Sequence, residues 1–558
     1  MLNKLFPKIL ILILLLSVSV FAQRELGVRA TESGGVLMPE QAAYDVRHYD
    51  LDLRVNPQEQ TIQGVLMAKA RIVKPIDKFV LDLDAPLTVE SVALVEGKKQ
   101  TPLKFERKDG QIWIDFPKMQ KAGNTVDVRV AYGGKPRVAP RPPWVGGFVW
   151  SKTADGQHWF ATAVQMDGSD LWFPVKDHPS DKPETTSLSF TVPGNLVAAS
   201  NGKLQSVVDN KDGTKTYKWF VSQPISNYNI ALNVAPYKVI EDKMQSVAGD
   251  TIPIVFYVLP EHADKGQSLV DKTKDYVRFF EEYLGPYPFR AEKLGIAHTP
   301  HLGMEHQTII AYGNDFKYDQ NGFDWLMFHE LGHEWWANLV TARDWNDFWI
   351  HEGFQSFFDA LWAEKKYGRE RFVKSLPNRI RATNNVKPVA PREPRTTTEM
   401  YALAPDYVKS DGDIYGKGAL ILNALRGLIG DEAFFKAVRR MAYPTPAMEK
   451  ITNGKQVRLV TTDDFLRIAE RESGKQLDWF FELYLRQPKL PKLISETNGN
   501  QLTLRWETPN NMPFPMPVEV KIGDQIKRVE MSSGKATIPL PQGASYEIDP
   551  NGWLLRAL

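Results

Sequence analysis

Two histidines and a glutamate in FHELGHEWWANL, residues 328–339, have the types and spacing of a metal site. His329 and His333 are four residues apart, so a helix would place both imidazoles on one face, one turn apart. Glu330 lies between them and can reach a water bound to the metal. A lone histidine is usually an ordinary core or surface residue, but a pair with this glutamate rarely arises by chance. The segment therefore predicts a metal-binding helix.

Glu352 is the candidate third ligand. A catalytic zinc site uses three protein ligands and leaves the fourth position to water. Eighteen residues separate Glu352 from His333, a gap that suits an antiparallel return of the predicted helix 349–367 against the first helix. A solvent-facing position is the competing interpretation, and the apolar neighbours Trp349 and Phe354 argue against it. We expect one zinc ion per chain, held by His329, His333 and Glu352.

Such a site would hydrolyse an amide bond. Zinc lowers the pKa of its bound water from about 16 to about 7 and polarises the scissile carbonyl. Glu330 would take the proton as general base and pass it to the leaving amine. No cysteine occurs in the chain, so no thiol competes for the metal.

The elements that must position these groups fall into three stretches. Six segments between residues 41 and 260 alternate apolar and polar residues, which is typical of half-buried strands. These segments are 49–55, 78–84, 112–116, 125–132, 187–192 and 226–234. The Pro- and Gly-rich stretch 133–147 interrupts them and is expected to form a long surface or cleft-lining loop.

Helical periodicity dominates from about residue 265 to 486. The predicted helices are 268–285, 323–341, 349–367, 417–429, 431–442, 463–472 and 477–486, with Thr462 as an N-cap and Gly368 as a helix end. Five short strand patterns follow between residues 501 and 549, enough for a small β-sandwich. We expect a multidomain α+β chain: a β-rich domain over 23–260, a mostly helical catalytic domain over 261–487 and a β-sandwich over 488–558.

Residues 1–22 read as a signal peptide. Lys4 and Lys8 precede an apolar stretch, and Ala22 is a small residue suited to cleavage before Gln23. The alternative is a single membrane anchor, but the apolar stretch is short for a bilayer core about 30 Å thick. We therefore expect export, to the periplasm or outside the cell, with no stable membrane insertion after cleavage.

Charge gives no case for a nucleic-acid or anionic-membrane partner. The 558 residues carry 69 basic and 67 acidic side chains, and removal of Lys4 and Lys8 leaves 67 of each. An exported chain without cysteine must rest on its core alone, and the 43% hydrophobic composition is that of an ordinary globular protein. The sequence does not indicate an oligomeric state.

The segment HELGHEWWANLVTARDWNDFWIHEGF, residues 329–354, resembles the aminopeptidase N and leukotriene hydrolase family of zinc metallopeptidases, the gluzincin aminopeptidases. The resemblance extends over nearly the whole chain after residue 22. It implies a thermolysin-like catalytic domain behind an N-terminal β-sheet domain. It also implies an aminopeptidase, which removes single residues from peptides that have a free N-terminus. The large C-terminal helical domain of many family members has no counterpart in this sequence.

Three further motifs carry implied roles. LGMEH, residues 302–306, is similar to the family's Gly-Ala-Met-Glu-Asn strand, which implies that the backbone of Gly303 and Met304 aligns the substrate while Glu305 binds its α-amino group. The segment 164–182 resembles the family stretch whose polar residue, here Gln165, also contacts that amine. YGKGA, at 415–419, looks like the family's helix start, which implies that Tyr415 stabilises the oxyanion.

Two departures and two rival functions accompany this interpretation. Leu302 and His306 stand where the family usually has glycine and asparagine, which affects the pocket for the first side chain.

A zinc endopeptidase would need the same metal site but no amine clamp, so Glu305 and Gln165 discriminate against it. A non-catalytic peptide-binding scaffold would typically have lost a ligand or the base, and none is missing here.

Overall fold

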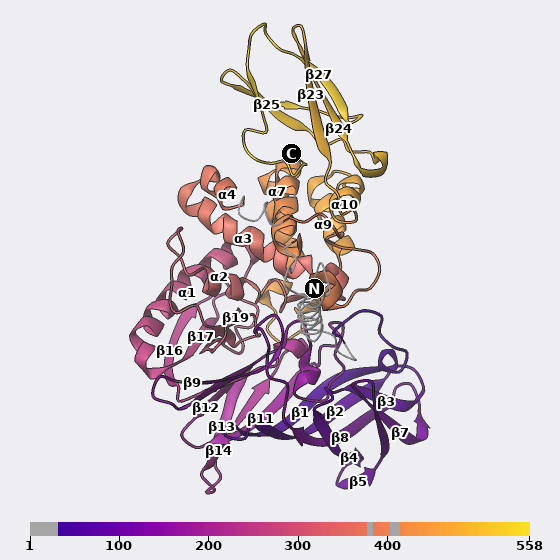
Figure 1. The fold of residues 1–558 in the computed structure, drawn as a ribbon, viewed down its shortest axis with the longest axis vertical. Coiled ribbons are helices and arrows are strands. Elements are labelled where there is room, and N and C mark those ends of the chain that lie inside the picture. Colours follow the sequence, from indigo (N-terminus) through magenta and orange to yellow (C-terminus); the bar gives the residue numbers. More distant parts are fainter. Residues whose placement is uncertain (1–31, 377–382, 402–412, 558) are drawn as a thin grey trace, which may run out of the picture.

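The structure is a computed structural model that describes residues 32–376, 383–401 and 413–557. The predicted signal peptide 1–22 and its cleavage point lie outside the described residues. Three layers follow the sequence: β-sheets first, helices in the middle and a small strand domain at the other end (Figure 1). Within the described part of the chain, no helix combines the length and apolarity needed to cross a bilayer.

An eight-stranded sheet forms most of the N-terminal domain. In spatial order it contains β13 (Lys203–Asp209), β14 (Thr214–Val221), β11 (Thr185–Pro193), β1 (Tyr44–Asn56), β2 (Thr61–Ile72), β8 (Thr125–Gly134), β4 (Leu87–Glu96) and β5 (Lys99–Pro102). The predicted alternation is real: Leu51 and Leu53 of β1 are buried, whereas Asp50 and Asp52 between them are exposed. The β1–β11 pair is parallel. One face of the sheet therefore supplies the domain core.

Two smaller sheets complete this domain. One contains β3 (Ile76–Asp82), β7 (Gln111–Gln120) and β6 (Lys104–Lys108), and the other β12 (Val197–Ser200), β15 (Leu232–Ala235), β10 (His158–Ala163) and β9 (Gly147–Lys152). The predicted strand 226–234 is mostly wrong, because a 3-10 turn over Asn227–Asn229 precedes β15. Buried hydrogen bonds of Asn227 and Asn229 with other segments favour this turn over an extended strand.

The catalytic domain combines a five-stranded sheet with helices. The sheet order is β16 (Lys238–Gln245), β17 (Thr251–Val258), β18 (Leu294–His298), β20 (Ile310–Tyr312) and β19 (Gly303–Met304). The helices are α1 (Ala263–Leu284), α2 (Trp325–Gly332), α3 (Trp349–Tyr367), α4 (Arg369–Ser375), α6 (Thr397–Tyr401), α7 (Gly418–Ile429), α8 (Asp431–Ala442), α9 (Thr462–Ser473) and α10 (Asp478–Tyr484). Strands β16 and β17 lie before residue 260 but pair with this sheet, and β21 (Val340–Ala342) pairs in parallel with β22 (Arg458–Val460).

Two local predictions in the helical region are wrong. The predicted helix 323–341 ends at Gly332 in α2, and turns lead from there to β21. Tertiary contacts prevail over periodicity here, because the Asn338 amide donates to the Glu305 carbonyl and to the Glu334 carboxylate. The N-cap of α9 is Thr461, whose hydroxyl accepts from the Asp464 amide, and not Thr462.

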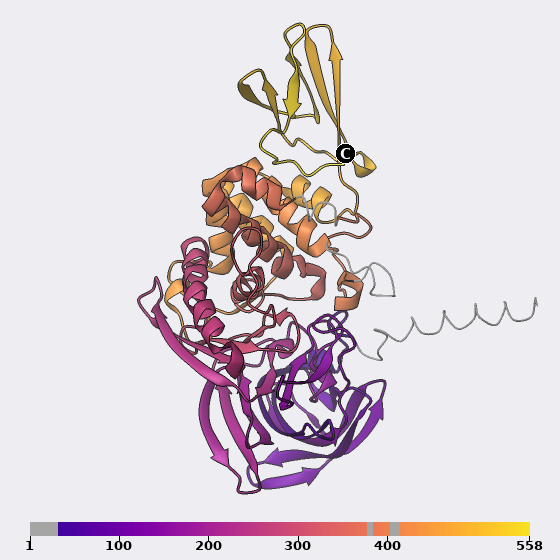
Figure 2. The ribbon, with the colours of Figure 1, turned by 60° about the vertical axis from the view of Figure 1, so that its left-hand side comes forward.

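The C-terminal domain consists of two three-stranded sheets. β23 (Lys492–Asn498), β24 (Gln501–Glu507) and β27 (Lys535–Pro539) form one, and β26 (Gln525–Val529), β25 (Val518–Ile522) and β28 (Tyr546–Ile548) form the other. Buried Leu502, Leu504 and Val520 alternate with exposed or half-buried residues on their strands. This domain lies beyond α7 and α10 (Figure 1) and far along the molecule from the N-terminal sheets (Figure 2).

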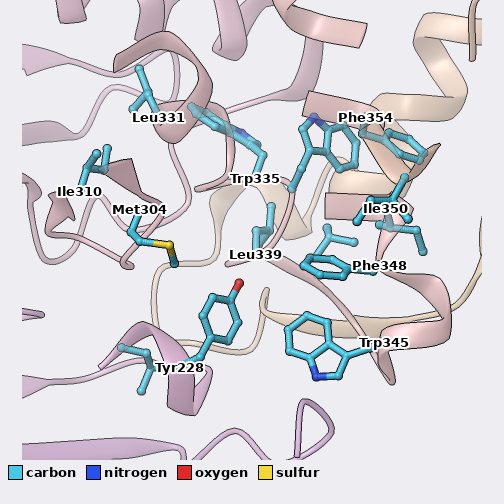
Figure 3. Close-up of a cluster of buried hydrophobic side chains, with 14 of the residues drawn as sticks. Tyr228, Met304, Ile310, Leu331, Trp335, Leu339, Trp345, Phe348, Ile350 and Phe354 are labelled. Carbon is cyan, nitrogen blue, oxygen red and sulfur yellow. The ribbon is translucent and has the colours of Figure 1, made fainter. Parts of the chain in front are cut away.

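A buried cluster joins the N-terminal and catalytic domains. Tyr228 from the N-terminal domain packs its ring edge-on against Trp345, with centroids 5.6 Å apart, and Trp345 packs on Phe348 at 4.7 Å. Figure 3 shows the Tyr228 phenol directed from one domain toward Met304 and Leu339 of the other. Because close-packed interiors leave little room for sliding, this cluster fixes the two domains at the wall of the site.

Candidate active site

Helices α2 and α3 bring the three predicted metal ligands together. Asp324 caps α2, its Oδ1 accepting from the Met327 amide at 3.1 Å. The Nε2 atoms of His329 and His333 lie 3.2 Å apart, and both face Glu352, whose Oε2 is 3.6 Å from the first and 3.5 Å from the second. The antiparallel return expected from the eighteen-residue gap therefore places all three groups at one point.

The other nitrogen of each imidazole is also held. His329 Nδ1 donates to Asp359 Oδ2 at 2.8 Å, and His333 Nδ1 donates to the Trp336 carbonyl at 2.8 Å. These bonds fix the tautomers that leave both Nε2 atoms free to bind a metal ion. Sequence reasoning missed Asp359, although it lies seven residues, or two helical turns, after Glu352 and so on the same face of α3.

The three residues fit a metal ion. Their candidate ligand atoms all lie within 4.8 Å of one another. Glu352 Oε2 is buried and has no hydrogen-bond partner in the structure, since both imidazole nitrogens lie beyond 3.4 Å from it. An unpartnered buried carboxylate oxygen is costly unless a cation compensates it. Two nitrogens and one oxygen with a buried, converging arrangement form the donor set of a catalytic zinc site.

The protonation energetics of these groups favour a cation between them. Burial alone would raise the pKa of Glu352, but His333 and His329 hold it well below its usual range. Burial alone would lower the pKa of His333, yet Glu352 raises it to about 9. Each side chain thus stabilises the charge of the other. With both imidazoles neutral, a divalent cation would supply the positive charge that stabilises the Glu352 carboxylate.

Strand β19 runs along the edge of the five-stranded sheet beside α2. Gly303 is the point of closest approach: a Cβ atom there would lie 2.7 Å from Leu326 Cδ1 and 2.9 Å from Glu330 Oε1. Glycine is therefore required for β19 to reach the helix. The same geometry places the Glu330 carboxylate against β19. Burial raises the pKa of Glu330 to about 8, against the opposing effect of His329.

Glu305 follows β19 directly and faces the metal ligands. Its Oε1 accepts from Gln165 Nε2 at 2.8 Å and from the Tyr228 hydroxyl at 3.0 Å. Gln165 also donates to Glu352 Oε1 at 3.2 Å, so one amide links the predicted amine clamp to the metal site. Both partners of Glu305 come from the N-terminal domain. Burial raises the pKa of Glu305, and a ligand cation would oppose that effect.

Tyr415 lies beside the metal ligands in the cavity lining. It sits on a π-helical turn, Asp413–Lys417, immediately before α7, and its ring stacks on His329 with centroids 6.4 Å apart. Such turns are frequent at functional sites. Gly353 and Gly418 allow this approach, because a Cβ on Gly418 would lie 2.8 Å from the Gly353 Cα. Helix α7 thus contacts α3 one residue after Glu352.

All nine predicted site residues line one cavity of about 250 Å³. The lining consists of Pro143, Trp144, Gln165, Leu302, Gly303, Met304, Glu305, Trp325, Leu326, His329, Glu330, His333, Glu352, Tyr401 and Tyr415. The stretch 133–147 lines the cleft through Pro143 and Trp144. Of the two departures noted above, Leu302 lies on the wall, whereas His306 is fully buried and is not part of it.

Sequence reasoning missed three residues that contact the predicted site residues: Asp359, Tyr228 and Tyr401. Asp359 could have been found from its helical spacing to Glu352. Tyr228 and Tyr401 carry no signal of their own, since each reaches the site only through the packing of one domain or segment on another.

Comparisons with known proteins identify the family of the two domains. Residues 46–229 match the model of the peptidase M1 N-terminal domain, and residues 269–484 match that of the peptidase family M1 domain. The probable aminopeptidase 2 of Sulfurisphaera tokodaii is 25% identical over 79% of this chain and 54% of its own length. The human glutamyl aminopeptidase is 28% identical over 62% of this chain and 36% of its own.

Solved structures share the fold. An M1 zinc metallopeptidase of Deinococcus radiodurans, solved with the substrate Tyr-Ser-Ala, superposes with a TM-score of 0.64 at 23% identity, covering 83% of this chain and 98% of that one. By contrast, this chain spans about half the length, or less, of the two curated relatives above. The two matched segments together cover most of the chain, in the order of the two domains that enclose the cavity. The chain belongs to peptidase family M1.

Proposed function

We propose that the chain is a zinc-dependent aminopeptidase that hydrolyses the first peptide bond of peptides with a free N-terminus. The observation that carries the proposal is Glu305, a buried carboxylate held by Gln165 and Tyr228 beside the metal ligands. A cationic amine is the partner that such a carboxylate binds best. An amine held there places the adjacent peptide bond next to the metal site.

Zinc, bound by His329, His333 and Glu352, would polarise the scissile carbonyl and activate the attacking water. Glu330 lies beside these ligands and against the substrate-aligning strand, as a proton carrier must. Burial raises the pKa of Glu330, and the charge of a bound metal ion would oppose that effect, so the carboxylate could take a proton from water and return it to the leaving nitrogen. The Tyr415 hydroxyl, which comes from the same cavity lining, would donate to the oxyanion that forms at the carbonyl.

Paired substrates test the amine clamp. Aminoacyl fluorophores with a free amine should be cleaved, and their N-acetylated counterparts should be nearly inert, because acetylation removes the cation. Glu305→Ala should lose more than about 2 kcal/mol of transition-state binding toward the free substrates. Glu281→Ala is a control, since this buried carboxylate accepts from Ser246 and the Tyr287 amide outside the cavity. Efficient internal cleavage of a blocked peptide would instead favour the endopeptidase.

The scaffold alternative makes a different prediction. A non-catalytic peptide binder would bind free N-termini without turnover. The complete set of His329, Glu330, His333, Glu352 and Tyr415 in one cavity supports an enzyme. Measurable release of the first residue, abolished by a chelator and restored by zinc, would exclude the scaffold.

Export remains part of the proposal. The chain would be secreted or periplasmic, with Gln23 as the first residue after cleavage of the signal peptide. Mass analysis of the N-terminus of exported material tests this, and an intact Met1 in the membrane fraction would favour the anchor.

A further inference from the structure

A short turn of the N-terminal domain contacts Glu305 from outside the cavity. The turn is the 3-10 segment Asn227–Asn229, and none of its residues is among those that line the cavity. Tyr228, its central residue, is buried, and its hydroxyl donates to Glu305 Oε1 at 3.0 Å. Figure 3 shows the phenol directed toward Met304, the residue before Glu305. The proposed amine-binding carboxylate therefore has a partner that stands behind it and not beside the substrate.

The direction of this hydrogen bond follows from the chemistry of its two groups. The form of Glu305 that binds an ammonium group is the ionised carboxylate, which has no hydrogen to donate. Burial raises the pKa of Tyr228 well above its ordinary value, so the phenol keeps its hydrogen at neutral pH. Tyr228 is therefore the donor. Its bond favours the charged form of Glu305, against burial, which raises the pKa of that carboxyl group.

The same turn also holds the backbone of Glu305. The Asn229 side-chain amide donates to Asn338 Oδ1 at 2.5 Å. The Asn338 amide in turn donates to the Glu305 carbonyl at 3.0 Å, and this fixes the orientation of Asn338 because a carbonyl can only accept. Two adjacent residues of one turn thus hold Glu305 at both ends: Tyr228 holds the carboxylate directly, and Asn229 holds the carbonyl through Asn338.

The turn is itself fixed to the N-terminal domain. The Asn227 side-chain amide donates to the Lys176 carbonyl at 2.7 Å, and the Asn227 carbonyl accepts from the Ser169 hydroxyl at 2.7 Å. Asn227 and Tyr228 are both buried. A donor held in this way restricts the carboxylate that it contacts, because any move of Glu305 would leave a buried hydroxyl without its partner.

We propose that Tyr228 is a positioning residue that holds the Glu305 carboxylate in place for the α-amino group of the substrate. The proposal rests on the amine-binding role given to Glu305. Gln165 donates to the same oxygen of Glu305, but it lines the cavity and can also contact the amine itself. Tyr228 acts through Glu305, so its effect is specific for ligands that carry an amine.

Two inhibitors that differ only in the amine give the first test. Leucine hydroxamate and 4-methylpentanohydroxamate share the zinc-binding group and the side chain, and only the first carries the ammonium group that Glu305 would bind. Because hydrogen bonds to charged groups are strong, Tyr228→Phe should weaken inhibition by leucine hydroxamate about tenfold and inhibition by the amine-free compound less than about twofold. With a leucyl fluorophore as substrate, KM should rise about tenfold while kcat stays within about twofold, as for loss of uniform binding.

Tyr132→Phe is the matched control. Its fully buried hydroxyl donates to the Trp172 carbonyl at 2.9 Å, outside the cavity, so both inhibition constants should stay unchanged. A merely structural role for Tyr228 would weaken both hydroxamates by the same factor, and that result overturns the proposal. Asn229→Ala covers a Tyr228 variant that fails to fold. It removes the second contact with Glu305 and should also weaken leucine hydroxamate selectively, whereas an equal loss for both inhibitors would again contradict the proposal.

A double-mutant cycle shows whether Tyr228 acts through Glu305. In the Glu305→Ala background, Tyr228→Phe should cause no further loss of leucine hydroxamate binding, because the group that it positions is gone. The outcomes also separate this inference from the function on which it rests. If Glu305→Ala weakened both hydroxamates equally, the amine-binding role of Glu305 itself would be refuted. If Glu305→Ala weakened only leucine hydroxamate and Tyr228→Phe weakened neither, only the positioning role would be refuted.

Discussion

Asp359→Asn tests whether the carboxylate behind His329 sustains the metal site. The change keeps the size of the side chain and removes its charge, at an oxygen 2.8 Å from His329 Nδ1. Burial alone would lower the pKa of His329, and Asp359 is the largest of the groups that raise it. The carboxylate thus increases the basicity of the ring that must bind zinc. The structure also gives Asp359 a second bond, from Gln355 Nε2 at 3.0 Å, which holds it in place.

The expected loss is roughly 10- to 100-fold in zinc affinity, the usual effect of removing such an outer partner. This corresponds to about 1.4 to 2.7 kcal/mol. Competition with a chromophoric chelator measures the affinity directly, and kcat at saturating zinc separates metal loss from damage to the reaction. Because Asn can still accept a hydrogen bond at Oδ1, much of the ring orientation should survive and kcat at saturating zinc should fall only a few-fold.

Glu364→Gln provides the control on the same helix. Glu364 pairs with Arg426 at 2.6 Å and does not contact the imidazoles. The Glu364→Gln variant should have lower thermal stability and unchanged zinc affinity. If Asp359→Asn bound zinc within twofold of the wild type, or if the control lost as much affinity, the reasoning about Asp359 would be refuted.

Three other perturbations have defined outcomes. Glu330→Gln should keep stoichiometric zinc by metal analysis and lose nearly all turnover, because the ligands remain and the proton carrier is gone. Gly418→Ala should cost about 1–3 kcal/mol in urea unfolding and lower kcat, since its Cβ would meet Gly353 at 2.8 Å and push α7 away. Burial lowers the pKa of His301 and His306 to about 3, so the unfolded chain, with pKa about 6.5, takes up protons first on acidification. Stability should therefore fall below pH 6.5, by about 2 kcal/mol per histidine between pH 7 and 5, and His301→Asn should flatten this slope.

The metal ligands could be predicted from sequence because a single helix fixes most of their geometry. His329 and His333 need only the period of α2, and the gap to Glu352 needs only one antiparallel return. The same local reasoning gave the bounds of α3 and its end at Gly368, where a positive φ of 82° suits glycine. It failed beyond Gly332, where buried Trp335 and Trp336 imitate helical periodicity although the chain turns.

Tyr228 and Tyr401 could not be predicted, because neither belongs to the element that it supports. Tyr228 reaches Glu305 across the domain boundary, over a sequence separation of 77 residues. Tyr401 reaches Tyr415 from a short helix whose position depends on Met166 and Ser33. Periodicity and motif spacing describe one segment at a time, so neither predicts contacts between segments of different domains.

Gln165 makes two long-range hydrogen bonds that bear on the proposed reaction. Its amide donates to Glu305, the proposed amine clamp, and to Glu352, a metal ligand, at 2.8 and 3.2 Å. An ammonium group bound to Glu305 and a metal ion bound to Glu352 would each bind a carboxylate that accepts a hydrogen bond from this one amide. Linkage requires that any effect of the metal on amine affinity be matched by an equal effect of the amine on metal affinity. On the proposed function, the N-terminal domain would therefore do more than close the cavity: through Gln165 it would couple recognition of the free N-terminus to the metal that acts on the adjacent bond.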